Sequence, residues 1–235
     1  MSLLTIIQRF TKRTGVVVPT TVTSSLDSQI IQLQALLEEE GEDLSKRGEW
    51  EALTVEKVHT TTAAEDQGAI TTIATNGFRY ICNETMWDRT DRLPVPLINS
   101  VAWQNIKATA NSTPRYRYRI RGGKLLITPT IAASHSLAFE YQTKNWITDL
   151  NGINPKAQFT ADTDLVLLHE DLMLLGLRWR WKKEKGLDYE EDFRTYEQAV
   201  TQYLSRDGGK PIMRMDGMPK DARPGMIVPE GSWAL

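Results

Sequence analysis

The stretch Arg115-Tyr-Arg-Tyr-Arg-Ile-Arg121, Gly122-Gly123, Lys124-Leu-Leu-Ile-Thr128 decides how the middle of this 235-residue chain folds. Cationic and apolar or aromatic side chains alternate strictly before the two glycines, and a largely apolar run follows them. Strict alternation is typical of a strand with one buried face, and a Gly-Gly pair suits a two-residue turn. The stretch therefore predicts a β-hairpin.

This predicted hairpin gathers cations on one face. Alternation and the turn bring together five basic side chains, Arg115, Arg117, Arg119, Arg121 and Lys124. The opposite face is expected to pack inward and carries Tyr116, Tyr118, Ile120, Leu125 and Ile127. Because like charges that face each other destabilise a sheet, the cations suggest an anionic partner, either DNA phosphate or carboxylates of a neighbouring subunit. A solvated strand edge that resists aggregation is the alternative.

The hairpin lies within a longer β-rich region, residues 50–150. Thr, Val, Ile and Tyr are frequent there, and Gly, Pro and Asn separate the segments, as expected of short strands and turns. A short helix is expected to interrupt the region at Ser100–Thr109, and Leu137–Tyr141 is expected to form a further strand.

Amphipathic helices are predicted on both sides of the β-rich region. Apolar residues recur at helical spacing over 3–14, 28–47, about 169–185 and 188–207. The apolar face of each helix cannot be buried within its own segment, so the two chain ends are expected to pack on each other. The expected contact residues are Phe10, Leu33, Leu37, Leu172, Trp179, Phe193 and Tyr196. The expected fold class is α+β: a helical bundle from residues 1–49 and 160–209 with a β-rich insertion at 50–150.

Two further stretches are distinctive. The acidic run Glu38–Asp43 falls on the second helix and is typical of a solvated face, with an acidic docking strip as the lesser alternative. Residues 210–235 hold four prolines and show no periodicity, which predicts an arm outside the core. The arm is expected to be mobile in the free protein and to order on a partner through Met213, Met215, Met218, Met226 and Trp233.

Bulk composition excludes several classes of protein. Twenty-eight basic and thirty acidic side chains give a formal net charge of -2, so the whole chain has no field that attracts DNA or anionic lipid. The single cysteine, Cys82, can form no disulfide within the chain, which fits a reducing cytosol. The N-terminal residues lack a basic start and a long apolar run, so neither a signal peptide nor a membrane span is expected.

No organised catalytic or metal-binding set emerges from the sequence. A phosphate-binding Gly-rich loop, a G-x-S-x-G elbow and an H-E-x-x-H motif are all absent. Asp162 and Asp164 could offer carboxylates to a divalent ion, but capping of a helix ahead of Leu165 explains them with fewer assumptions. The histidines fall in three separate segments, at His59, His135 and His169. We therefore expect no enzyme, cofactor or metal.

Several short motifs occur along the chain in an order that is similar to that of a known protein family. The motifs are Leu3–Phe10, Leu36–Gly41, Ala64–Gly68, Phe78–Ile81, Tyr118–Gly123, Phe139–Tyr141, Phe159–Thr163, Gly176–Trp181 and Gly186–Tyr189. In this order they are similar to the head-to-tail adaptor, or connector, proteins of short-tailed and related bacteriophages, the class that includes the tail tubular adaptor. None is a mechanistic motif, so no catalytic residue carries over.

The resemblance implies a virion structural protein. Members of this family form a helical bundle from both chain ends with a β-rich insertion, and twelve copies make a ring beneath the portal vertex that continues the DNA channel. Implied partners are the portal protein, other copies of the chain, the next tail component (nozzle or tail tube) and the passing DNA, with no membrane. The implied location is the head–tail junction, after assembly in the host bacterial cytoplasm, with the arm as a portal-docking element. A DNA-binding protein that uses the Arg115–Lys124 hairpin is the alternative.

Overall fold

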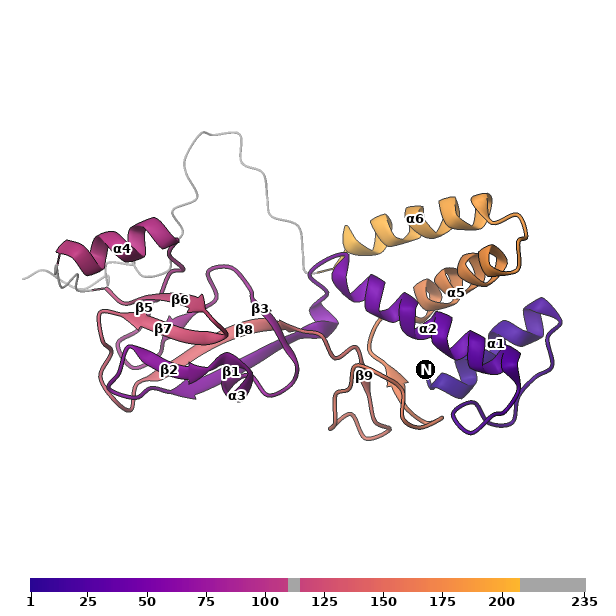
Figure 1. Ribbon diagram of the computed structural model, residues 1–235, viewed down its shortest axis with the longest axis horizontal. Coiled ribbons are helices and arrows are strands. Elements are labelled where there is room, and N and C mark those ends of the chain that lie inside the picture. Colours follow the sequence, from indigo (N-terminus) through magenta and orange to yellow (C-terminus); the bar gives the residue numbers. More distant parts are fainter. Residues whose placement is uncertain (110–114, 208–235) are drawn as a thin grey trace, which may run out of the picture. The chain divides into compact units, whose positions relative to one another are not determined.

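The computed structural model describes residues 1–109 and 115–207 and has a mixed α+β fold (Figure 1). Its four long helices are α1 (Leu3–Thr14), α2 (Ser28–Lys46), α5 (Glu170–Glu184) and α6 (Glu190–Leu204). They come from both ends of the sequence and share one hydrophobic core, with the β-strands between them in the chain. The predicted fold class is therefore confirmed, and the predicted helical segments match the observed helices closely.

The helices begin and end where local chemistry favours it. Ser2 caps α1 by accepting a hydrogen bond from the Thr5 backbone N–H, and Asp27 caps α2 in the same way through Gln29. Gly15 ends α1 in the left-handed conformation, at φ 73°, that glycine adopts without strain.

The bundle core confirms six of the seven predicted core residues and corrects one. Phe10, Leu33, Leu37, Leu172, Trp179 and Tyr196 are all buried. Phe193 is 37% exposed, so its placement in the core was wrong. The physical reason is that α6 buries only a narrow face, Tyr196 and Val200. Phe193, in the first turn of α6, meets Trp179 edge-on at 5.1 Å between ring centroids and leaves part of its ring exposed.

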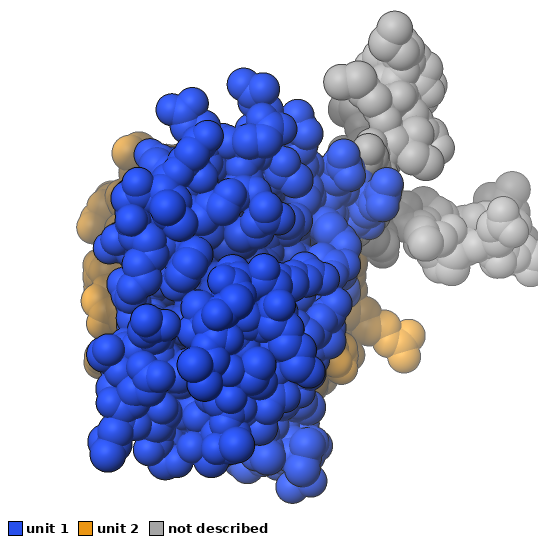
Figure 2. Space-filling view, turned by 90° about the vertical axis from the view of Figure 1, so that its right-hand side faces the viewer, with its two compact units in different colours: residues 1–55, 74–80, 141–210 blue, residues 56–73, 81–140, 211–235 orange. Residues whose placement is uncertain are grey.

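The chain divides into two compact units, coloured blue and orange in Figure 2. The first, here the helical unit, comprises 1–55, 74–80 and the chain from 141 to the end of α6. It also contains the antiparallel pair β9 (Ile147–Thr148) and β10 (Leu165–Val166). The second, here the sheet unit, comprises 56–73 and 81–140. Within the described residues, no helix has the length and apolar character that a membrane span requires.

The strands between α2 and α5 form two main sheets. The first joins β1 (Thr54–Thr60), β8 (Ser136–Thr143), β4 (Trp87–Asp88) and β5 (Leu93–Pro94) in that order, with β3 (Phe78–Ile81) also paired to β8. The second has the order β2 (Asp66–Ala69), β7 (Lys124–Thr128), β6 (Arg117–Arg121). Two short helices accompany them, α3 (Ile70–Ile73) and α4 (Ser100–Thr109). The hairpin, the helix at 100–109 and the strand around 137–141 were all predicted.

Candidate functional site

The arginine hairpin, residues 115–124, has the predicted register. β6 and β7 are antiparallel, with Arg117 opposite Thr128, Arg119 opposite Leu126 and Arg121 opposite Lys124. Gly122 and Gly123 turn the chain at φ 59° and 72°, a conformation that favours glycine at both positions. Directly opposite residues share a face, so three arginines and Lys124 lie on one side of the sheet. Arg115 precedes β6 and is exposed.

The cationic face is not the open row that the sequence suggested. Helix α4 packs against it, because Leu126 on this face is 5% exposed and forms an apolar cluster with Trp103 and Ile98. Arg119 donates a hydrogen bond to the Ser100 hydroxyl of α4 at 2.7 Å and is half-buried, as is Arg117. The exposed cations of the hairpin are thus confined to its two ends.

The opposite face of the hairpin packs inward as predicted. Tyr118, Leu125 and Ile127 are buried, whereas Tyr116 and Ile120 are half-buried. Burial raises the pKa of Tyr118 to about 12, so its hydroxyl stays neutral under physiological conditions. This face therefore anchors the hairpin on the sheet unit.

Some cations of the hairpin have an acidic partner within the described part of the chain and others do not. Lys124 Nζ lies 2.6 Å from Asp66 Oδ2 on β2, and this bond lowers the pKa of Asp66. None of the ion pairs within the described residues involves Arg117 or Arg121. Arg121 is exposed beside the turn, so it is the cation best placed to meet a carboxylate or phosphate of a partner.

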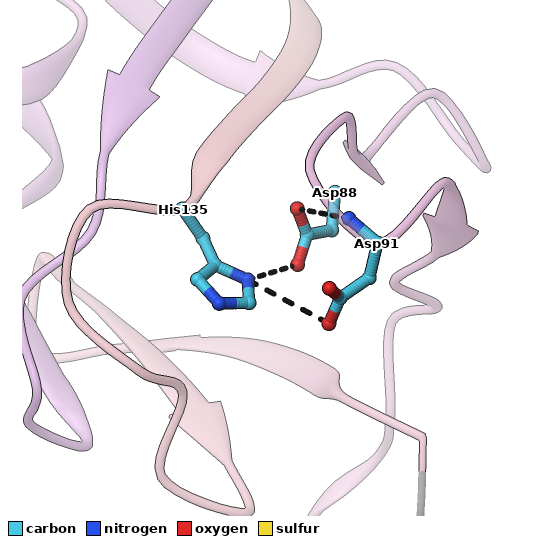
Figure 3. A group of neighbouring side chains, drawn as sticks. All are labelled: Asp88, Asp91 and His135. Atoms are coloured by element: carbon cyan, nitrogen blue, oxygen red, sulfur yellow. Dashed lines mark hydrogen bonds and ion pairs between the residues drawn. The ribbon is translucent and has the colours of Figure 1, made fainter.

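Three side chains of the sheet unit form a second polar cluster (Figure 3). His135 Nδ1 lies 2.6 Å from Asp88 Oδ2 and 3.7 Å from Asp91 Oδ2. The possible ligand atoms all lie within 4.8 Å of one another, a set that suits a cation such as Zn²⁺ in chemical type. Asp88 is fully buried, however, and its other oxygen accepts hydrogen bonds from the backbone N–H groups of Thr90 and Asp91.

These hydrogen bonds satisfy the cluster without a metal. Asp88 has both oxygens engaged, so a cation would have to displace the bond to His135. The hydrogen bond that the His135 imidazole donates to Asp88 raises the pKa of His135, which favours the charged imidazolium and an ion pair. We interpret the cluster as a clasp between β4 and the segment that leads into β8. No local pattern indicated this cluster, because His135 lies 47 positions from Asp88 along the chain.

A buried ion pair lies in the helical unit. Arg180 Nε donates to Glu40 Oε2 at 2.7 Å, and the same guanidinium also binds Glu39 and Asp43. Glu40 is fully buried, so the interpretation of Glu38–Asp43 as a solvated face is wrong at this position. Burial raises the pKa of Glu40, and the hydrogen bond from Arg180 opposes that rise.

Asp162 and Asp164 hold loops and do not cap a helix. Asp162 accepts hydrogen bonds from the backbone N–H groups of Val22 and Thr23, and Asp164 accepts one from Thr160 and binds Lys156. Burial opposes their ionisation, but these partners outweigh it and lower both pKa values. The capping prediction was wrong because a strand, β10, follows Asp164, and the next helix begins only at Glu170.

The predicted portal-docking residues lie outside the described part of the chain; these are Met213, Met215, Met218, Met226 and Trp233. In comparisons with known proteins, no family model and no curated protein matches this chain.

Proposed function

We propose that the chain is a structural subunit, without catalytic activity, of an adaptor ring that joins a bacteriophage portal to the tail. In this proposal twelve copies surround the DNA channel at the head–tail junction of the virion. The neighbours of the ring are the portal protein and the next tail component.

One observation carries this proposal. Helices from both chain ends pack into one core, and the β-sheets are inserted between them in the sequence. This is the architecture that the resemblance implies, and the helices and hairpin were predicted from periodicity without reference to it. The order of motifs and the architecture therefore agree.

The surface of the hairpin suits a contact between subunits. Arg121 is exposed beside the Gly122–Gly123 turn, and an arginine can bind a carboxylate through two parallel hydrogen bonds. The acidic run Glu38–Asp43 is a weaker counter-surface than expected, because Arg180 of the same chain already binds three of its carboxylates. Acids elsewhere on a neighbouring copy are the better partners.

The test is reconstitution with the portal of the phage that encodes the chain. We expect the purified protein, mixed with portal rings, to form a complex of fixed stoichiometry, with twelve chains for each portal ring by native mass spectrometry. Portal rings of an unrelated phage serve as the control. If the folded protein and intact portal rings form no complex at micromolar concentrations, the proposal fails.

The alternative, DNA binding through the hairpin, has a separate readout. Affinity for DNA that arises from phosphate contacts falls steeply as salt rises. We expect weak retention on a DNA column at physiological salt, because the chain has a net charge of -2 and Lys124 is paired with Asp66. Tight, salt-sensitive retention together with failure to bind the portal would favour the alternative.

A further inference from the structure

An apolar groove opens on the helical unit where α1 and α5 end. It has a volume of about 600 Å³ and is lined by Phe10, Arg13, Thr14, Leu174, Arg178, Trp181, Lys182 and Leu187. Phe10 and Leu174 are buried, and the Phe10 ring meets Trp181 edge-on at 5.8 Å between centroids. Leu187 beside them is 49% exposed. A volume of this size accommodates a few large side chains.

The rim of the groove is cationic. Arg178 lies 3.1 Å from Asp192, and Lys182 also binds Asp192, so one carboxylate serves two cations. Arg13 is exposed in the last turn of α1 and takes part in no ion pair within the described residues. An apolar floor beside a net positive rim is complementary to an apolar peptide that carries one acid.

The distal half of the arm is an apolar peptide of this kind, with one acid. Residues 224–235 read Pro-Gly-Met-Ile-Val-Pro-Glu-Gly-Ser-Trp-Ala-Leu, and Glu230 is their only charged side chain. Met226 and Trp233 flank that acid as apolar anchors. Residues 210–223 carry four basic and two acidic side chains, so they do not match a cationic rim. The distal half alone fits both the floor and the rim.

The arm is long enough to reach the groove of its own chain. The end of α6 lies beside the start of α5, since the Tyr203 hydroxyl is 3.4 Å from Asp171. From Asp171 to Leu187 is about 24 Å at the rise of a helix, whereas residues 208–225 can extend to roughly 60 Å. A tether of this length gives an effective concentration in the millimolar range, which favours the chain's own groove over that of a second copy.

We propose that residues 226–233 dock in the groove of the same chain, with Met226 and Trp233 on the apolar floor and Glu230 facing Arg13. The sequence alone predicts an arm that is mobile in the free protein, and the groove changes that expectation for its distal half. Docking covers an apolar surface and holds the anchors until a partner competes for them. This proposal stands independently of the adaptor function.

Photo-crosslinking in the full-length protein tests the docking. Trp233 is replaced by p-benzoylphenylalanine, the protein is irradiated, and the crosslinked peptides are mapped by mass spectrometry. An equal mixture of ¹⁵N-labelled and unlabelled protein separates crosslinks within one chain from those between chains. We expect crosslinks to 10–14 and 174–187, each within a single isotopic species. Crosslinks between labelled and unlabelled chains, or none to these two segments, would overturn the proposal.

Charge reversal tests the predicted ion pair. Arg13→Glu and Glu230→Lys should each lower the crosslink yield about two- to fivefold, as expected for a partly exposed ion pair, and the double variant should restore it. Arg194→Glu, an exposed arginine on α6, is the matched control and should leave the yield unchanged. Circular dichroism confirms that each variant is folded. A double variant with a yield no higher than the single variants contradicts the pairing of Glu230 with Arg13.

Discussion

Gly176 of α5 lies directly against the carboxylate of Glu40 on α2, so that a Cβ atom at position 176 would sit 2.0 Å from the Glu40 Cδ. The absence of a side chain lets the two helices approach closely. One turn further along α5, Arg180 binds that same carboxylate. The two helices therefore meet around a buried ion pair as well as around apolar side chains.

Gly176→Ala should destabilise the helical unit by about 1–3 kcal/mol, since the added methyl group overlaps the Glu40 carboxylate. In a Glu40→Ala background the overlap is gone, and the same substitution should stabilise by about 0.5–1 kcal/mol through helix propensity. Urea unfolding of the four proteins measures both differences. An equal cost in both backgrounds would show that the overlap is relieved elsewhere.

Glu40 should make stability depend on pH. Burial raises its pKa above the ordinary value of 4.5, so the folded state binds the proton more tightly than the unfolded state. The stability that Glu40 contributes is greatest below pH 4.5 and is lost as the pH rises through the raised pKa. The unfolding free energy of the original protein should therefore fall as the pH rises above 4.5, and Glu40→Gln should remove this fall.

The control for Glu40 is its neighbour Glu39, which also binds Arg180 but has a side chain that is 62% exposed. Glu39→Gln should cost less than about 1 kcal/mol, because an exposed ion pair contributes little to stability. Glu40→Gln should also cost less than the roughly 3–5 kcal/mol typical of a stranded buried charge, because Arg180 keeps Glu39 and Asp43. Unfolding free energies between pH 4 and 8 for the two variants decide the matter.

The sequence predicted the long helices and the hairpin well because their signals are local. Apolar spacing of 3.6 residues and strict alternation hold over many positions, so one exception does not hide them. The burial of Glu40 was missed for a related reason. Its spacing from Leu37 and Leu44 places it on the buried stripe, but it stands in a run of acids that reads as a solvated face.

Contacts between distant segments could not be predicted in this way. His135 meets Asp88 across 47 positions of sequence, and only the pairing of β4 with β8 brings them together. Similarly, α4 was predicted as a helix, but nothing in its own periodicity showed that Trp103 packs over Leu126 on the cationic face of the hairpin. The register of a hairpin is local, whereas the layer that covers it is not.

Truncating two predicted core residues should have unequal effects. Leu37→Ala should cost about 2–5 kcal/mol, because Leu37 is fully buried between helices. Phe193→Ala should cost less, about 1 kcal/mol, since Phe193 is 37% exposed and loses mainly its edge contact with Trp179. Chemical unfolding compares the two. Equal costs would place Phe193 in the core after all.

His135 and His59 should titrate apart. The hydrogen bond to Asp88 raises the pKa of His135, whereas burial lowers that of His59. Because the folded pKa of His135 is raised, its stabilising effect is complete below the ordinary value of 6.5 and is lost as the pH rises through the raised value. Titration by NMR should find the pKa of His135 above that of His59, and Asp88→Asn should bring the pKa of His135 back towards 6.5 while leaving that of His59 unchanged. If the pKa of His135 is the same in the Asp88→Asn variant as in the original protein, the two side chains do not form the clasp.

The hairpin cations should act in assembly more than in DNA binding. Arg117→Gln with Arg121→Gln removes two cations that have no acidic partner among the described ion pairs. Arg194→Gln with Arg206→Gln, two exposed arginines at α6 and just beyond it, is the matched control. We expect the hairpin variant to form rings or portal complexes several-fold more weakly than the control, since bidentate carboxylate contacts are lost.

Salt dependence separates this outcome from a DNA-facing hairpin. Each phosphate contact adds about 0.9 to the slope of log affinity against log salt, so two lost contacts would lower that slope by about 2. We expect no such change, because the chain has a net charge of -2 and α4 covers the middle of the cationic face. If instead assembly is unchanged while DNA retention and its salt slope collapse, Arg117 and Arg121 face DNA. The hairpin would then line the channel and would not join neighbouring subunits.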